Sequence, residues 1–243
     1  MTMIVDRLQA VRDRITTACG AAGRDPAGVR LLAVSKTFGP EAVLAAMSGG
    51  QTAFGENYVQ EGVEKILAVR ELLAGGLSVR ACGPASPPAW HHIGPLQSNK
   101  TRLVAEHFDW VQSVDRLKIA QRLSEQRPGH LPPLQVCLQV NIDGGATKAG
   151  VAPEEVLALA AAVVLLPRLQ LRGLMSIPEP APDFVAACAV HKRAAGLFEH
   201  INRSGVLAQP MDTLSMGMTA DLEAAIHAGS TMVRVGTAIF GGR

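Results

Sequence analysis

The chain has 243 residues, of which 48% are hydrophobic and 18% charged, so it can bury a large core and is not a disordered chain. Its formal net charge of +2, without a run of lysine or arginine, gives no sign of a nucleic-acid partner. The longest apolar run, residues 156–166, is well short of the ~18 residues of a membrane span, so we expect no membrane partner. Four widely spaced cysteines, and a charged opening segment where a signal peptide would be apolar, favour a cytoplasmic chain with free thiols.

The opening segment is predicted to be a helix. Ile4, Leu8, Val11, Ile15 and Ala18 follow one another at spacings of four and three, which places them on one face of an amphipathic helix. After it, apolar runs separated by helical patterns and by Gly or Pro signals predict eight strands. These strands cover residues 30–36, 52–57, 90–94, 109–114, 133–142, 169–177, 212–218 and 231–240.

Eight strands that alternate with helices predict one α/β domain over residues 1–243. Such alternation requires a parallel sheet with right-handed crossovers, and eight units in about 250 residues is the length of a (β/α)8 TIM barrel. The alternative is an open doubly wound sheet, which would have fewer strands and a glycine-rich fingerprint after the first strand. Neither feature is present, so the sequence favours a barrel with an extra helix before its first strand.

The strand ends carry the most informative polar residues. Barrels place their functional sites at the C-terminal ends of the strands, so the residues that end the eight apolar runs would surround one mouth. They are Lys36, Glu56, Asn57, His92, Gly94, Ser113, Asn141, Met175, Ser176, Ser215, Gly217, Arg234, Gly236 and Thr237.

The last two strands end in glycine and hydroxyl residues, at positions 215–217 and 236–237. Barrels frequently bind phosphate between these two loops, and glycine lets backbone N–H groups approach the anion closely. Two adjacent sites of this kind favour phosphate binding over simple turns. Asp221 and Glu223, in the next helix, would repel a phosphate, so we expect their side chains to point away from it.

An amine, a phosphate cradle and a cation at one mouth together indicate one cofactor. Lys36 ends the first strand, and Arg234 lies two residues before the glycine that ends the eighth. A ligand with an aldehyde, a phosphate and a ring nitrogen between them would satisfy all three groups, and pyridoxal 5′-phosphate (PLP) is that ligand. An apolar wall and a nearby guanidinium both disfavour the ammonium form of Lys36, which favours an amine that can form a Schiff base.

The sequence also resembles a known family along nearly its whole length. The stretches LLAVSKT, FGENYVQE, WHHIGPLQSNK, LRGLMSI, DTLSMGM and MVRVGTAIFG closely match the pyridoxal phosphate homeostasis proteins, the YggS/PROSC family. The resemblance implies the fold of the barrel domain of bacterial alanine racemase, with PLP on Lys36 and with Arg234 facing the pyridine nitrogen. The other positions that match the family are Asn57 near the ring and Ser215, Gly236 and Thr237 at the phosphate. Met175, at the end of the sixth strand, is a further candidate cofactor-binding residue.

Two positions depart from the family pattern, and a third matches it but has two possible roles. His92 stands where an aromatic Phe is expected, and Phe38 stands where the family often has a basic residue or histidine, although neither change removes a cofactor-binding group. Lys148, after the fifth strand, matches a recurrent family lysine that either receives the cofactor in transit or is a solvated loop residue. His91 and His92 alternate faces and have no third ligand at metal spacing, so we expect no metal site.

The resemblance implies a carrier of PLP rather than an enzyme. A cation beside the pyridine nitrogen keeps that nitrogen unprotonated, which makes the ring a poorer electron sink. Alanine racemase takes one catalytic base from a tyrosine in a second, β-rich domain, whereas Tyr58 is the only tyrosine of this sequence and we expect no second domain after the eighth strand. We therefore expect a monomer that binds and buffers PLP and hands it to apo-enzymes. The alternatives are a PLP-dependent amino-acid racemase or decarboxylase, and a sugar-phosphate enzyme that forms no Schiff base.

Overall fold

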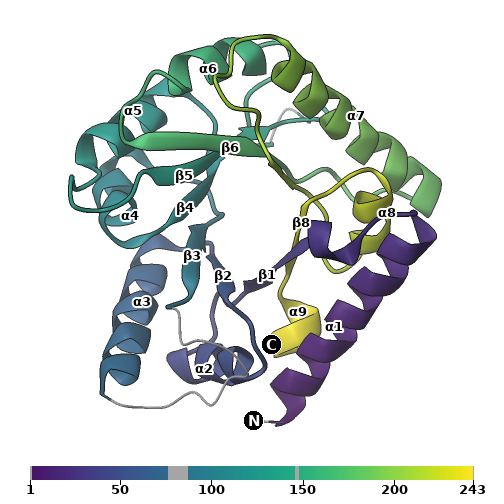
Figure 1. Cartoon of the computed structure of the whole chain (residues 1–243). Helices are drawn as coiled ribbons and strands as arrows, with labels where there is room; N and C mark the ends of the chain where they lie inside the picture. The colour runs from purple at the N-terminus through teal and green to yellow at the C-terminus, as the bar shows by residue number, and fades with distance from the viewer. Residues whose placement is uncertain (1, 76–86, 146–147, 243) are drawn as a thin grey trace.

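The computed structural model describes residues 2–75, 87–145 and 148–242, which form a closed barrel of eight parallel strands surrounded by helices (Figure 1). Neighbouring strands pair in chain order, and the eighth closes on the first. The strands are β1 Arg30–Val34, β2 Ala53–Glu56, β3 Ala89–His92, β4 Trp110–Val114, β5 Leu134–Val140, β6 Leu169–Ser176, β7 Thr213–Ser215 and β8 Met232–Val235. The α-helices are α1 Thr2–Ala21, α2 Pro40–Ser48, α3 Val59–Ala74, α4 Thr101–His107, α5 Leu117–Gln126, α6 Val156–Val163, α7 Phe184–Arg203, α8 Leu222–His227 and α9 Thr237–Phe240, with short 3-10 turns at Pro26–Gly28 and Ser98–Lys100. The predicted (β/α)8 barrel with an additional N-terminal helix is confirmed.

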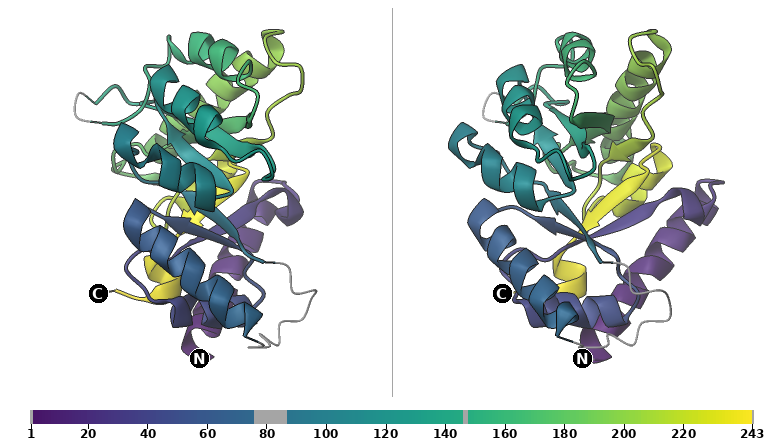
Figure 2. Two further views of the ribbon diagram at one scale, coloured as in Figure 1. Left: turned by 90° about the vertical axis from the view of Figure 1, so that its left-hand side faces the viewer. Right: turned by 60° about the vertical axis from the view of Figure 1, so that its left-hand side comes forward.

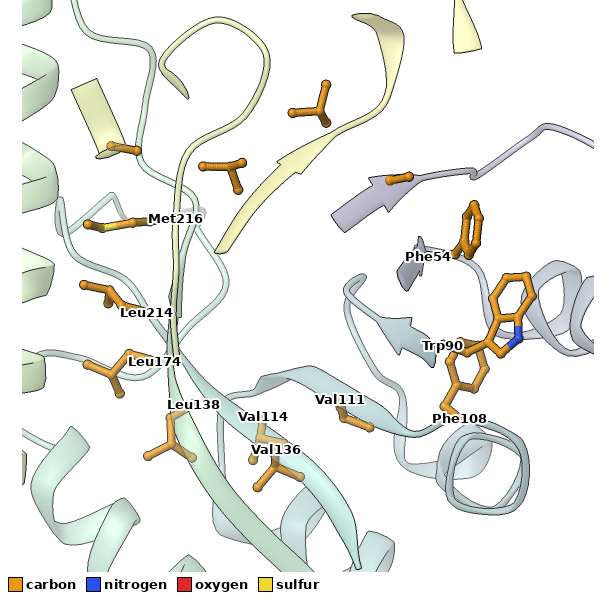
Figure 3. Packing of buried hydrophobic residues seen from close by; sticks show 14 of the residues in the cluster. Phe54, Trp90, Phe108, Val111, Val114, Val136, Leu138, Leu174, Leu214 and Met216 are labelled. Atoms are coloured by element: carbon orange, nitrogen blue, oxygen red, sulfur yellow. The ribbon is translucent and has the colours of Figure 1, made fainter. Parts of the chain in front are cut away.

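Alternate residues of each strand belong to two different apolar layers, because successive side chains point to opposite faces. The outward-facing residues pack beneath the helices and form the main core. Examples labelled in Figure 3 are Val111, Val136, Leu138, Leu174, Leu214 and Met216. The inward-facing residues form two smaller clusters inside the barrel, one of Leu32, Val34, Ile93 and Met232 and one of Trp110, Cys137 and Met175.

The barrel interior at the N-terminal end of the strands is filled by groups stacked on Trp110. The guanidinium carbons of Arg30 and Arg172 lie 5.7 Å and 5.0 Å from the centre of the Trp110 ring, and the His91 ring stacks on it at 4.9 Å. Arg172 also forms an ion pair with Asp212. Because these cation–π and stacking contacts occupy that end, a ligand site inside the strand ring belongs at the opposite, C-terminal end.

Helix α1 covers the side of the barrel where the first and last elements of the chain meet. Its predicted apolar face is buried, with Leu8, Val11 and Ile15 each at most 5% exposed. The helix packs on α8 and α9, as both views of Figure 2 show for α9. An ion pair of 2.9 Å between Arg14 and Glu223 joins α1 to α8.

Several predicted strands are longer in the sequence pattern than in the structure. The predicted first strand, 30–36, ends at Val34, so Lys36 follows it, and the two largest differences are in the last two strands. The expected strand 231–240 is wrong beyond Val235, because Gly236 begins the short helix α9 and Phe240 turns into the core. The expected strand 212–218 contains only Thr213–Ser215 in its ladder. The chain leaves this strand at Gly217, where φ is +91° and an added Cβ would lie 2.4 Å from the Cβ of Ala225, so only glycine fits there.

Three of the four cysteines, Cys19, Cys137 and Cys188, are buried free thiols, and Cys82 lies outside the described residues. Across the described ranges, no helix has the length and apolar character that crossing a membrane requires. In the same parts of the chain, no group of three or more histidine, cysteine or acidic side chains is arranged to hold a metal ion.

Candidate functional site

Lys36 lies in a tight turn directly after β1, beside the end of β8. With Thr37 and Phe38 it lines a pocket of about 90 Å³, and Gly236 and Thr237 line the same pocket. Lys36 is half-buried, so part of the residue is open to solvent. The pocket is smaller than the ~300 Å³ that encloses a typical small-molecule ligand, so a ligand held there stays partly exposed. The structure thus brings together the amine and the glycine–hydroxyl pair that the sequence placed at one mouth.

Arg234 is buried inside the barrel, two residues before Gly236. Its Nη1 donates to the carbonyl and hydroxyl oxygens of Ser215, both at 2.8 Å, and its Nη2 donates to the Ser176 carbonyl at 2.9 Å. Burial lowers the pKa of Arg234 to about 10, which is still well above neutral pH. Arg234 is therefore a permanently charged guanidinium held in one orientation.

A directed chain of hydrogen bonds runs from Arg234 across the barrel. The Ser215 hydroxyl accepts from Arg234 and donates to Gln112 Oε1 at 2.7 Å, and Gln112 Nε2 lies 2.9 Å from His91 Nδ1. Because an amide nitrogen only donates, Nδ1 of His91 accepts and the imidazole is neutral. Burial lowers the pKa of His91 to about 3, which agrees with this neutral state. Because Ser215 donates its one hydroxyl proton to Gln112, its hydroxyl oxygen acts only as an acceptor toward Arg234. In this structure Ser215 therefore holds the guanidinium in place.

Sequence reasoning missed Gln112. The available signal is a lone amide within the apolar strand 109–114, because a polar side chain buried in a barrel strand needs a hydrogen-bonding partner. Met175, predicted from the end of the sixth strand, is fully buried in the cluster with Trp110 and Cys137. It pairs in register with Ser215 across β6 and β7 and does not line the pocket of Lys36.

Most of the unpartnered buried polar atoms of the described residues lie at or next to the C-terminal ends of strands. They are Glu56 Oε2 and Asn57 Oδ1 at β2, Nδ1 and Nε2 of His92 at β3, Ser113 Oγ in β4, Asn141 Oδ1 after β5 and Ser176 Oγ at the end of β6, whereas Nδ1 of His107 and Nδ1 of His191 lie on helices. Buried polar groups in folded proteins are nearly always hydrogen-bonded. This concentration therefore marks the C-terminal mouth of the barrel as the place where a polar ligand would complete the hydrogen bonding.

The structure places the two residues that depart from the family pattern, Phe38 and His92, in different surroundings. Phe38 lines the Lys36 pocket, and its ring lies 5.2 Å from that of Phe240. His92 packs edge-on against Phe108, with ring centres 5.6 Å apart, in the layer between the strands and the helices. Burial lowers the pKa of His92 to about 4, so it is a neutral core residue and not a second base beside Lys36.

Lys148 is placed away from the Lys36 pocket. Its Nζ lies 3.1 Å from a carboxylate oxygen of Glu179 and 3.5 Å from the carbonyl oxygen of Ile177. The side chain is 25% exposed, so it is a loop lysine held by an ion pair near the end of β6.

A larger pocket of about 330 Å³ lies between the loops that follow β6 and β7. Its lining includes the carboxylates of Glu179, Asp183, Asp221 and Glu223. Asp221 pairs with His191 at 2.9 Å and Glu223 pairs with Arg14 at 2.9 Å, and neither acidic residue lines the pocket of Lys36. Like charge makes this acidic pocket unsuitable for a phosphate group.

Comparisons with known proteins show the family to which the chain belongs. Residues 7–243 match the family model described as alanine racemase, N-terminal domain. Over all 243 residues of this chain, the pyridoxal phosphate homeostasis proteins of Pseudomonas aeruginosa and Escherichia coli K12 are 54% and 51% identical, covering 97% and 98% of those proteins. The chain belongs to the pyridoxal phosphate homeostasis protein family.

Solved structures place the family among related barrels. PipY of Synechococcus elongatus, determined with PLP bound, is 32% identical with a TM-score of 0.79, and the match covers 98% of this chain and 100% of PipY. Alanine racemase from Enterococcus faecalis (E. faecalis) is 20% identical with a TM-score of 0.63, and the match covers 97% of this chain but 58% of the racemase. The homeostasis proteins therefore share the barrel fold of alanine racemase, as the sequence motifs indicated.

Proposed function

We propose that this chain binds PLP as a Schiff base on Lys36 and acts in PLP homeostasis as a carrier and buffer of the cofactor. The observation that carries the proposal is the single pocket lined by Lys36, Gly236 and Thr237. It occurs in a chain 54% identical to a named homeostasis protein and structurally similar to PipY with PLP bound. PLP supplies an aldehyde and, in enzymes, an electron sink for carbanion chemistry.

The residues at the mouth fit such a ligand. The Lys36 amine can condense with the aldehyde, forming a C=N bond while the carbonyl oxygen leaves as water. Gly236 brings backbone close to the pocket, since a Cβ there would lie 3.0 Å from the Val34 carbonyl. No side chain caps the first turn of α9, which leaves N–H groups and the Thr237 hydroxyl for a phosphate. The unpartnered Asn57 Oδ1 is a hydrogen-bond acceptor at the same mouth.

Arg234 favours storage of the cofactor over catalysis. A permanently charged guanidinium that faces the ring nitrogen disfavours the pyridinium form and weakens the electron sink. Ser215 fixes this guanidinium with two hydrogen bonds, and Met175 packs beside Ser215 in the adjoining strand. We therefore propose that the chain hands PLP to apo-enzymes and performs no turnover of its own.

The test of Schiff-base binding is the visible absorption spectrum after addition of PLP. Lys36→Ala is expected to lose the visible band while its far-UV circular dichroism stays unchanged. Lys148→Ala removes a lysine from a loop outside the pocket and is the matched control, which should keep the band. An unchanged spectrum in Lys36→Ala would refute the assignment.

The test of the carrier role is single-turnover reaction of the loaded protein with a panel of amino acids in deuterated solvent. A carrier leaves the α-protons in place. Rapid exchange of the α-proton of any one amino acid would overturn the carrier role in favour of a racemase or decarboxylase.

A further inference from the structure

The turn that carries Lys36 is held in a strained backbone conformation. The Phe38 N–H donates to the Ser35 carbonyl at 3.1 Å, so Lys36 and Thr37 are the two central residues of a four-residue turn. Thr37 has φ of +68°, the only positive value among the described residues other than glycine. This left-handed region is strongly disfavoured for a β-branched side chain, so the surrounding contacts must impose it.

A buried ion pair contacts the residue that precedes Lys36. Lys65 of α3 and Glu56 of β2 lie 2.7 Å apart, and their side chains are 3% and 0% exposed. Lys65 Nζ also donates to the Ser35 carbonyl at 2.7 Å, and the Ser35 hydroxyl donates to Glu56 Oε1 at 2.6 Å. Both the backbone and the side chain of Ser35 are therefore tied to the ion pair.

Glu61 contacts the residue that follows Lys36. Its carboxylate accepts the Thr37 N–H and lies 3.1 Å from Lys65 Nζ. Gly62 lets α3 approach β2 closely enough for these contacts, because a Cβ there would lie 3.2 Å from the Glu56 Cβ. Lys36 is thus bracketed by hydrogen bonds to the carbonyl before it and to the amide after it.

We propose that Glu56, Glu61 and Lys65 are positioning residues that hold the Lys36 turn in the conformation needed to receive the cofactor. This inference rests on the proposed function of Lys36. Burying an ammonium and a carboxylate is costly, and packed apolar side chains would join β2 to α3 at least as well. A strained turn that its surroundings over-determine points to a functional role.

The test compares PLP affinity and thermal stability among variants of the full chain. Lys65→Met removes the donor from α3 to the Ser35 carbonyl, so the dissociation constant for PLP is expected to rise about tenfold or more. The double variant Glu56→Gln/Lys65→Met leaves no uncompensated buried charge, so its stability recovers. Its PLP affinity should stay weak, because the Ser35 carbonyl keeps the Phe38 N–H but still lacks the Lys65 ammonium that ties it to α3. If the Glu56–Lys65 ion pair only stabilised the fold, the double variant would regain PLP affinity together with thermal stability.

Glu61→Ala removes the acceptor of the Thr37 N–H, supplies a readout that needs no bound cofactor and keeps the fold, because the Glu61 side chain is 33% exposed. In the protein without PLP, the Thr37 amide hydrogen should exchange with deuterated solvent faster than in the wild type. An unchanged exchange rate at Thr37 would overturn the positioning role.

Arg127→Met is the control for loss of a buried cation. Arg127 is 4% exposed and donates to the carbonyl oxygens of Ala105, Phe108 and Pro132, none of which belongs to the Lys36 turn. We expect it to lower stability as Lys65→Met does and to leave PLP affinity unchanged.

The outcomes separate the two proposals. If borohydride reduction of the loaded wild type leaves Lys36 unlabelled, the proposed function fails and the positioning role fails with it. If the wild type is labelled at Lys36 but Lys65→Met binds PLP as tightly as the wild type, only the positioning role fails.

Discussion

Acidification should destabilise the barrel, because two neighbouring histidines of β3 are buried in their neutral form. Burial lowers the pKa of His91 to about 3 and that of His92 to about 4, from an ordinary value of 6.5. As the pH falls below 6.5, the unfolded chain takes up protons that the folded chain does not. The stability that these residues contribute is therefore present above pH 6.5 and is lost progressively below it.

The variant His92→Phe isolates one of these two groups. From the two pKa values, His92 accounts for a loss of about 2 kcal/mol in the free energy of unfolding between pH 7 and pH 5. Phenylalanine removes the titration and keeps an aromatic ring against Phe108. Burial raises the pKa of the Glu56 carboxyl, which acts in the opposite sense, so the useful quantity is the difference between wild type and variant.

The assay is urea unfolding of both proteins at the two pH values. The wild type should lose about 2 kcal/mol more than His92→Phe on going from pH 7 to pH 5. His130→Gln changes an exposed histidine and is the control that should follow the wild type. Equal losses in the wild type and His92→Phe would mean that folded His92 takes up its proton normally, and would refute its burial against Phe108.

Three further substitutions test single contacts. Thr237→Val keeps the side-chain shape without the hydroxyl and should weaken PLP binding by about 1–3 kcal/mol in an absorbance titration; unchanged affinity would remove Thr237 from the phosphate site. Ser215→Ala should lower the free energy of unfolding in urea by about 1–3 kcal/mol, because Gln112 Oε1 and one Arg234 N–H lose their partner inside the barrel; unfolding like that of the wild type would contradict the hydrogen-bond chain. Thr37→Gly relieves the left-handed backbone and should raise the free energy of unfolding by about 0.5–1 kcal/mol after the entropy cost of glycine; a lower melting temperature would contradict the strain.

The fold was predictable because its signals are local. The apolar run at residues 133–142 contains the observed strand Leu134–Val140, and the spacing of the opening segment matches the buried face of α1. The end of β8 was not predictable, because residues 237–240 are apolar and read as a continuing strand. Only the packing of Phe240 against Phe38 and the core distinguishes a helical turn there.

The site was predictable where single residue types at strand ends indicated their own chemistry. Lys36 and residues 236–237 were expected together and do line one pocket. The partners of Gln112 and Lys65 were not predictable, since Gln112 bonds a residue 103 positions away and Lys65 reaches Ser35 across two elements. Such hydrogen bonds depend on which side chains the barrel brings face to face, and no periodic pattern in the sequence records them.

The most direct measurement is borohydride reduction of the PLP-loaded protein, followed by peptide mapping. A single pyridoxyl label on the peptide that contains Lys36 is the predicted result. A label confined to Lys148, or a colourless protein that takes up no label, would contradict the assignment of Lys36 as the residue that carries the cofactor.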